Sequence, residues 1–383
     1  MPNLARIFVC LWSGLPLAAS GSDFSPLRSY LAEAVDDGVV AGGAVLVIHR
    51  GKPVFESGFG FANLEAKVPF EVDTPVVIAS ISKPLLGTAA FRISQAGQLD
   101  LGEPISTYLP EFSELVLESG ERASRAPTMV ELFTHTSGLR NDESPGGRPW
   151  FAGWTKGKTL EEVVRGYAEN FPLKAPPGIR YAYSGIGTDV AARVAEVASG
   201  SSRNDLLRET VCRPLGMSHT YYWNTADRSE RLIMPKRYFR DEQSGKLRLS
   251  NKRRQVPADE YTASGGTIIS TAGDLSRWLL MLRNGGEHGG QAFLDPELLG
   301  KLLSGTGLGR NSQGGFFIRK RDADGQALVV GHTGSSGTNC WIDLETDTIG
   351  IMLTQTRGRD IRKFRLEVEK WVEKCIGAAP DAQ

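Results

Sequence analysis

Residues 74–83 read Thr-Pro-Val-Val-Ile-Ala-Ser-Ile-Ser-Lys, an apolar run followed by two serines and a lysine. The pattern beyond this run predicts a helix from about Ser80 to Ala96 that stops at Gly97. Ser80 and Lys83 are three residues apart, so the first turn of that helix brings the hydroxyl and the amine onto one face. A neutral amine can take the proton of an attacking serine, and a helix N-terminus favours a developing anion.

A Ser-x-x-Lys spacing does not establish catalysis by itself, because it is frequent by chance and most often marks exposed helix residues. Other motifs give no rival site: the sequence has neither a G-x-S-x-G turn nor a G-x-x-x-x-G-K-[ST] loop. Gly58-Phe-Gly60 is an incomplete dinucleotide-binding pattern and predicts no cofactor. The interpretation of Ser80 and Lys83 therefore depends on the segments around them.

Further segments follow in order along the chain. They are Gln98–Leu101 with Tyr108–Pro110, Leu132–Leu139 (LFTHTSGL), Pro176–Gly185 (PPGIRYAYSG), Pro214–Met217 (PLGM), Ser264–Gly266 with Ser270–Thr271, and His332–Ser335 (HTGS). Together with residues 74–83 they resemble the class C β-lactamase family, which also holds D,D-peptidases and β-lactamase-like esterases. The resemblance extends from about residue 25 to residue 375. It implies a serine hydrolase that works through an acyl-enzyme.

The resemblance also implies roles for individual residues, with no cofactor and no metal. Ser80 would be the acylated nucleophile, Lys83 its partner, and Tyr183 a second base or proton shuttle. A phenol titrates at about 10, so the Lys83 charge would have to lower the pKa of Tyr183 for it to act as a base near neutrality. Whether the lysine or the tyrosine takes the first proton stays open. The remaining roles are an oxyanion site between the backbone amides of Ser80 and Ser335, and a facing wall formed by His332, Thr333 and Gly334.

Two departures from the family pattern bear on the substrate. Gly185 stands where the tyrosine motif commonly has an asparagine that can hydrogen-bond a substrate amide. His332 replaces a lysine, and a mostly neutral imidazole would hold a substrate carboxylate less firmly. Both changes favour a carboxylic ester or small amide as the substrate. The alternatives are a D,D-carboxypeptidase or class C-like β-lactamase, and a non-catalytic protein that binds cell-wall peptides or penicillin-like ligands.

His135 and Ser137 could be taken for a second serine–histidine pair. They belong to the HTSGL segment, which in the resembling family serves packing and turn formation. We therefore expect these two side chains to be structural.

The hydrophobic pattern places strands at both ends of the chain around a helical middle. The expected helices are 26–37, 80–96, 160–169, 188–198 and 360–375, and the expected strands are 44–50, 54–61, 327–330, 340–343 and 349–354. One more helix is expected to begin after Thr271 as its N-cap, with the Asp274 side chain at the third position completing a capping box. The fold class is mixed α/β (α+β). With the resemblance, it becomes a β-lactamase/transpeptidase-like fold: an antiparallel sheet built from both termini, flanking helices and an inserted helical lobe. We expect one hydrolase domain over residues 21–383, with the sheet drawn from about 25–75 and 310–378.

Composition narrows the class of protein further. Of 383 residues 40% are hydrophobic, which is enough for a buried core, and 44 basic side chains balance 44 acidic ones. A net charge of zero gives no electrostatic reason to expect nucleic acid as a partner. The five histidines lie far apart and form no zinc pattern. Beyond residue 20 only Cys212, Cys340 and Cys375 remain, so at most one disulfide could form.

Residues 1–20 have the character of an export signal. Arg6 precedes an apolar run from Ile7 to Leu17, which small residues follow at 18–20. The run is too short to span a bilayer, and a buried N-terminal helix is the alternative. We expect a cleaved leader and a periplasmic or secreted protein without a membrane span in the mature chain.

Residues 228–254 hold ten basic and three acidic side chains, a difference of seven. A solvated hairpin is the simpler interpretation. The functional one is a basic rim that attracts anionic substrates or cell-wall polymer.

Overall fold

The computed structural model describes residues 22–139, 154–226, 229, 233–241, 243–250 and 256–377. The expected leader at residues 1–20 lies outside these ranges. The main feature is an antiparallel seven-stranded sheet in the order β11-β12-β13-β14-β1-β2-β3. Its strands are β1 (Gly42–His49), β2 (Lys52–Asn63), β3 (Val68–Pro69), β11 (Phe317–Arg321), β12 (Ala327–Thr333), β13 (Asn339–Asp343) and β14 (Thr348–Thr354).

The pairing of β1 with β14 joins the two ends of the chain at the middle of this sheet, from Gly43↔Thr354 to His49↔Thr348. β1 is buried along almost its whole length, which explains its unbroken apolar sequence: both faces of the strand are covered. Val45 and Val47 face the packed pair α1 (Ser25–Asp36) and α11 (Asp360–Gly377). The predicted mixed fold, with one sheet built from both termini, is confirmed.

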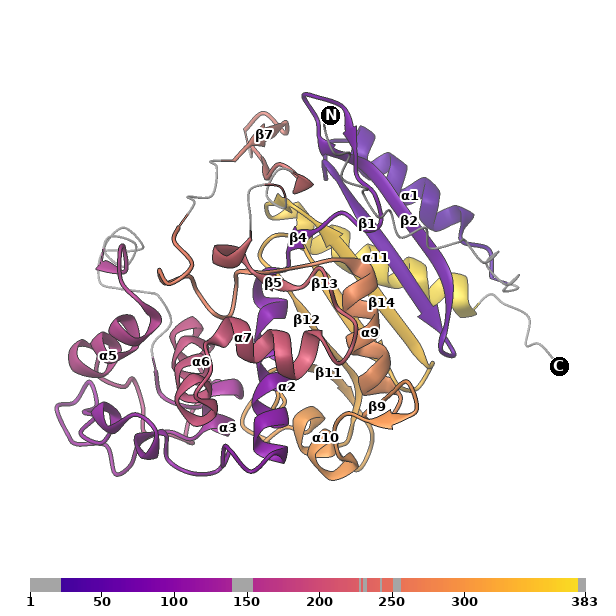
Figure 1. Ribbon diagram of the computed structural model, residues 1–383. Helices are drawn as coiled ribbons and strands as arrows, with labels where there is room; N and C mark the ends of the chain where they lie inside the picture. The colour runs from indigo at the N-terminus through magenta and orange to yellow at the C-terminus, as the bar shows by residue number, and fades with distance from the viewer. Residues whose placement is uncertain are drawn as a thin grey trace, which may run out of the picture.

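The other face of the sheet carries α9 (Ala272–Arg283), which contacts β1 and β14. Beyond it, α2 (Ser82–Gln95) runs between the sheet and a lobe of helices and loops (Figure 1). The lobe and its surroundings contain η2 (Ile105–Thr107), η3 (Pro110–Phe112), α3 (Met129–Phe133), α5 (Leu160–Asn170), α6 (Gly185–Ser199), α7 (Arg203–Leu207), the π-helical turn η4 (Arg208–Cys212), η5 (Trp223–Thr225) and α10 (Pro296–Leu303).

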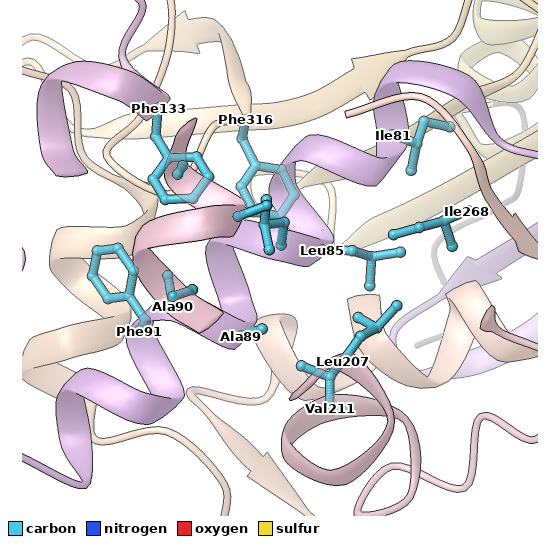
Figure 2. Packing of buried hydrophobic residues seen from close by; sticks show 14 of the residues in the cluster. Ile81, Leu85, Ala89, Ala90, Phe91, Phe133, Leu207, Val211, Ile268 and Phe316 are labelled. Atoms are coloured by element: carbon cyan, nitrogen blue, oxygen red, sulfur yellow. The ribbon is translucent and has the colours of Figure 1, made fainter. Parts of the chain in front are cut away.

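The N-terminal part of α2 is deeply buried: Leu85, Leu86 and even Lys83 are almost inaccessible to solvent. Figure 2 shows Leu85 and Ala89 facing Leu207 and Val211 of the α7–η4 segment. Burying one leucine side chain contributes about 1.5–3 kcal/mol. This packing fixes the helix, and with it any group at its N-terminus.

A small three-stranded sheet, β4-β8-β5, leads into α2. It is formed by β4 (Val76–Val77), β8 (Ile268–Ser270) and β5 (Tyr221–Tyr222). Two further pairs are β9 (Glu287–His288) with β10 (Gln291–Ala292), and the hairpin β6 (Tyr238–Arg240) with β7 (Leu247–Leu249), which β15 (Thr356–Arg357) extends in parallel.

Three local expectations need correction. The helix expected from Ser80 begins at Ser82, after a 3₁₀ turn over Ala79–Ile81 that we call the nucleophile turn. Thr271 caps α9 by accepting from the Asp274 amide at 3.2 Å, but the Asp274 carboxylate does not reach back and instead accepts from the His219 amide. β11 was not predicted, because the charged residues of this edge strand hide its apolar pattern.

The described part of the basic segment forms the β6–β7 hairpin, as the simpler interpretation predicts. Arg240 pairs with Asp360 and Arg248 with Asp241, so part of the positive charge is neutralised. Lys236, Arg237 and Lys246 also lie in this described part, whereas the basic residues at 228, 231 and 252–254 lie outside the described residues.

Cys212, Cys340 and Cys375 are buried free thiols. Among the described residues no group of three or more histidine, cysteine, aspartate or glutamate side chains could hold a metal ion. None of the described helices is long and apolar enough to cross a membrane.

Candidate active site

The nucleophile turn presents Ser80 at the N-terminal end of α2. Ala79, the residue before the serine, has φ +51°, a left-handed conformation that costs a residue with a Cβ roughly 1–2 kcal/mol. The turn is held by β4, since Val77 and Ile78 directly precede it, and it leaves the Ser80 side chain partly exposed. Strain at one residue and a fixed strand on one side therefore define where the hydroxyl lies.

Lys83 reaches back over one turn and lies 3.2 Å from the Ser80 hydroxyl, measured from Nζ to Oγ. Although the lysine is on α2 and the serine precedes the helix, the three-residue spacing brings the two groups together as predicted. Only 5% of Lys83 is exposed, and its Nζ also donates to the Gly265 carbonyl at 2.9 Å. A Cβ on Gly265 would lie 2.9 Å from the lysine Nζ, so the motif glycine makes room for this contact.

The Gly265 carbonyl is positioned by a buried polar network that the sequence analysis missed. The Asp189 carboxylate, on α6, accepts from the Ser264 amide at 2.7 Å and from the Tyr261 hydroxyl at 2.7 Å. Burial raises the pKa of Asp189, while these hydrogen bonds counteract the shift. Arg203 donates to the Ser264 hydroxyl from the other side at 2.7 Å. Asp189 lies inside a helix with no motif around it, so only its burial identifies its role.

Tyr183 lies against Lys83, whose Nζ is 5.0 Å from the centre of the phenol ring. The residue is half-buried and directly precedes Ser184, which caps α6 by accepting from the Gly187 amide at 2.9 Å. The structure therefore brings Ser80, Lys83 and Tyr183 to one place from two separate motifs.

His135 packs against Tyr183 and fixes the backbone that follows it. Its ring packs on the Tyr183 ring with centroids 4.3 Å apart, and its Nδ1 accepts from the Ser184 amide at 3.2 Å. Burial, with the nearby Lys83 charge, lowers the pKa of His135 to about 3, so the imidazole is neutral. Ser137 is buried and accepts from the Leu139 amide. His135 and Ser137 of the HTSGL segment therefore have structural contacts, as expected, and do not hydrogen-bond to each other in the described structure.

The end of β12 and its turn, residues 333–338, face the nucleophile turn; we call this segment the β12 turn. The Thr338 hydroxyl donates to the Ile78 carbonyl at 2.9 Å, and Ser336 donates to the Val77 carbonyl at 2.8 Å. A Cβ on Gly334 would lie 2.5 Å from the Ile78 oxygen, so the two backbones meet only because this residue is glycine. Two segments about 260 residues apart in the sequence are thereby held together by hydrogen bonds.

The backbone amides of Ser80 and Ser335 donate no hydrogen bond to any residue in the described ranges. Ser335 is exposed, Thr333 is half-buried and Gly334 is buried. Arg357, which sequence reasoning missed, donates to the Ser335 carbonyl at 3.2 Å and approaches its hydroxyl at 3.4 Å. No motif marks Arg357, because it comes near the site only through the fold.

His332 lies in the interior of the protein, beside β11. The residue is fully buried, its ring stacks on Phe317 of β11 at 3.9 Å, and its Nδ1 donates to the Thr333 carbonyl at 2.8 Å. Burial lowers the pKa of His332 well below its usual range. The His332 side chain is thus buried beneath Phe317 in this structure, and its expected role in the substrate wall stays a prediction.

The chain matches the beta-lactamase family over residues 27–369. It is 32% identical over 241 residues to D-alanyl-D-alanine-carboxypeptidase/endopeptidase AmpH of Escherichia coli K12, covering 62% of this chain and 56% of AmpH. It is 30% identical over 198 residues to esterase EstB of Burkholderia gladioli, covering 50% of this chain and 49% of EstB. The chain thus spans about half the length of these two curated relatives.

Solved structures share the fold. EstCE1, a hydrolase with promiscuous acyltransferase activity, superposes with a TM-score of 0.77 at 22% identity, over 90% of this chain and 97% of its own. Simvastatin synthase (LovD) of Aspergillus terreus gives 0.76 at 19% identity, over 96% of this chain and 100% of its own. Because the family match covers residues 27–369, the chain belongs to the beta-lactamase family.

Proposed function

We propose that this protein is a serine hydrolase that forms an acyl-enzyme at Ser80 and acts on a carboxylic ester or small amide. The observation that carries the proposal is the 3.2 Å contact between the Ser80 hydroxyl and a buried Lys83 amine, beside Tyr183. A weakly nucleophilic hydroxyl needs an adjacent base, and a buried amine within hydrogen-bond reach meets that need.

The chemistry follows in two balanced steps. In the first, Ser80 Oγ bonds to the substrate carbonyl carbon, its proton passes to Lys83 or Tyr183, and the leaving alcohol or amine departs with a proton. In the second, water attacks the acyl-enzyme, the carboxylic acid is released and Ser80 regains its proton. The amides of Ser80 and Ser335 would stabilise the oxyanion in both steps, which is commonly worth about 10²–10³-fold in rate per donor.

Turnover of p-nitrophenyl butyrate by the whole chain tests the proposal. We expect release of p-nitrophenol, and an acyl adduct on Ser80 in the mass spectrum of a rapidly quenched reaction. Ser80→Ala should abolish both, while Ser113→Ala, at an exposed serine after η3, should change neither. Equal turnover in the parent and in Ser80→Ala would exclude Ser80 as the nucleophile.

A D,D-carboxypeptidase is the second candidate, and the position of Arg357 favours it. A guanidinium beside Ser335 supplies a cation near the open site that His332 does not, and a peptide ending in D-Ala-D-Ala carries a carboxylate. Similarity to AmpH supports the same substrate class. Release of D-alanine from such a peptide at a higher kcat/KM than that of p-nitrophenyl butyrate would favour this candidate over the esterase.

Binding of either substrate without any turnover, unchanged in Ser80→Ala, would instead indicate the non-catalytic binding protein. We also propose that the protein is exported, on the pattern of residues 1–20. Cell fractionation together with N-terminal sequencing of the mature protein tests this: a cytoplasmic protein that keeps its first twenty residues would contradict it.

A further inference from the structure

Arg365, on α11, contacts the β12 turn. Its Nη1 donates to the Gly334 carbonyl at 2.9 Å and to the Thr338 carbonyl at 3.3 Å. Ile361, one helix turn before the arginine, packs against the same turn: a Cβ added to Gly337 would lie 3.1 Å from its side chain. Packing of α11 on the turn therefore fixes where the guanidinium lies.

The carbonyl that Arg365 holds belongs to the same peptide unit as the Ser335 amide. A peptide unit is planar, so a donor that fixes the Gly334 oxygen also fixes the direction of the Ser335 N–H. Hydrogen bonds in series polarise one another, so a cation on the oxygen makes the N–H a stronger donor. This N–H is one of the two donors that would stabilise the oxyanion in the proposed reaction.

The Arg365 guanidinium forms no ion pair with an acidic side chain in the described ranges. Glu369, on the next turn of α11, pairs with Arg319 at 2.7 Å and accepts from Asn339. Burial, with the Arg319 charge, lowers the pKa of Arg365 from its ordinary value, but a guanidinium stays protonated at neutral pH. The charge of Arg365 is therefore directed at the two carbonyl oxygens of the β12 turn.

The β12 turn has other hydrogen bonds that close it. The Gly337 amide donates to the Gly334 carbonyl at 3.0 Å, and the Gly334 amide donates to the Thr338 carbonyl at 2.8 Å. A carbonyl oxygen has two lone pairs, so the Gly334 oxygen accepts from Gly337 and from Arg365 together. Without the arginine the turn keeps its backbone bonds and loses the cation on its oxygen.

We propose that Arg365 is a positioning residue of the oxyanion site, which aims the Ser335 N–H at the developing anion and strengthens it as a donor. The inference rests on the proposed function, because it requires an oxyanion formed by attack of Ser80. Arg365 acts through the peptide and does not touch the substrate. Its loss should weaken one donor without removing it, so we expect a cost of about tenfold, below the roughly 10²–10³-fold of a removed donor.

The test uses p-nitrophenyl butyrate and phenylboronic acid with the whole chain. The boron bonds to the Ser80 oxygen and becomes tetrahedral, which places a boronate oxygen in the oxyanion position. Arg365→Met removes the charge and the donors; we expect kcat to fall about tenfold, KM to stay within about twofold, and the inhibition constant of phenylboronic acid to rise about tenfold. Arg365→Lys keeps a charged donor and should stay within about threefold of the parent in all three values.

The matched control is Arg362→Met, which removes an exposed arginine from the same helix and should change none of these values. Circular dichroism and melting temperatures are compared for all variants, and Arg365→Gln replaces Arg365→Met if the latter does not fold.

The outcomes separate this inference from the proposed function. If the parent neither hydrolyses the ester nor binds phenylboronic acid, the proposed function fails, and the inference fails with it. If the parent does both, three results would overturn the inference alone: parent-like values in Arg365→Met, a higher KM with unchanged kcat, or equal losses in Arg365→Met and Arg362→Met.

Discussion

The two sides of the candidate active site differ in how they are held. On one side, Ser80 and Lys83 are neighbours in the sequence, and one turn of backbone brings them within 3.2 Å. On the other side, the β12 turn reaches the nucleophile turn only through hydrogen bonds to Val77 and Ile78 from residues more than 250 positions later. The first side is encoded locally and the second by the assembled sheet. Variants on the first side should therefore remove a reacting group, whereas variants on the second side should displace a segment of backbone.

Removing the Lys83 amine should have the largest effect. Lys83→Met keeps the length of the side chain but removes the group beside Ser80, and loss of a general base commonly costs about 10²–10⁴-fold in rate. We expect kcat on p-nitrophenyl butyrate to fall by about that factor with little change in KM. Lys83→Arg keeps the charge but cannot deprotonate, so it should be equally inactive. An active arginine variant would show that the lysine acts through its charge alone.

On the opposite side, Gly334→Ala should separate the two facing backbones. The added Cβ would lie 2.0 Å from the Thr338 hydroxyl and 2.5 Å from the Ile78 oxygen, so the β12 turn must shift. Displacing one oxyanion donor predicts a fall of about 10²-fold or more in kcat. The matched control is Gly325→Ala at a tip with open space around it, although its φ of +82° makes the change strained there too. Equal activity of Gly334→Ala and the parent would show that the β12 turn has no role in catalysis.

His135 should act by positioning Tyr183. His135→Ala removes both the acceptor for the Ser184 amide and the ring beneath the tyrosine, and we expect kcat to fall about tenfold, roughly the value of one lost hydrogen bond. His135→Asn should recover part of this loss, because asparagine tolerates the φ of +58° at this position and offers an oxygen acceptor. Recovery by asparagine but not by leucine, measured as kcat, would distinguish positioning from simple packing.

The same residue predicts a pH dependence of stability. The pKa of His135 is about 3 in the folded protein, below that of an unfolded histidine at about 6.5. The unfolded state therefore binds more protons between these values, and the free energy of unfolding falls as the pH drops from about 6.5 towards 3. Urea unfolding at a series of pH values should give a shallower slope for His135→Asn than for the parent. Parallel slopes would contradict a buried neutral His135.

The smallest effect is expected at His332. Because this ring is buried under Phe317, His332→Leu should change kcat/KM for p-nitrophenyl butyrate by less than about threefold and act mainly on stability. Thr333→Val, at the half-buried neighbour, should alter KM more. If KM rises more in His332→Leu than in Thr333→Val, the histidine side chain does contact the substrate.

The sequence allowed some contacts of the site residues to be predicted and not others, and the reason is physical. Spacing along one helix turn is a local property, so the contact between Ser80 and Lys83 could be anticipated even though the serine lies just before the helix. The environment of His332 depends on Phe317 from a neighbouring strand that the sequence pattern did not reveal. Arg357 and Asp189 carry no motif, and their relevance comes entirely from the residues that the fold brings beside them.

The sequence by itself determined the order of the motifs, the strands at both ends of the chain and the apolar character of β1, because periodicity and local spacing are written in neighbouring residues. Only the tertiary structure decided which motif side chains face the open site, that His332 is buried while Ser335 is exposed, and that Arg365 reaches the Gly334 carbonyl. Burial and hydrogen-bond satisfaction depend on residues distant in the chain, and no local pattern specifies them.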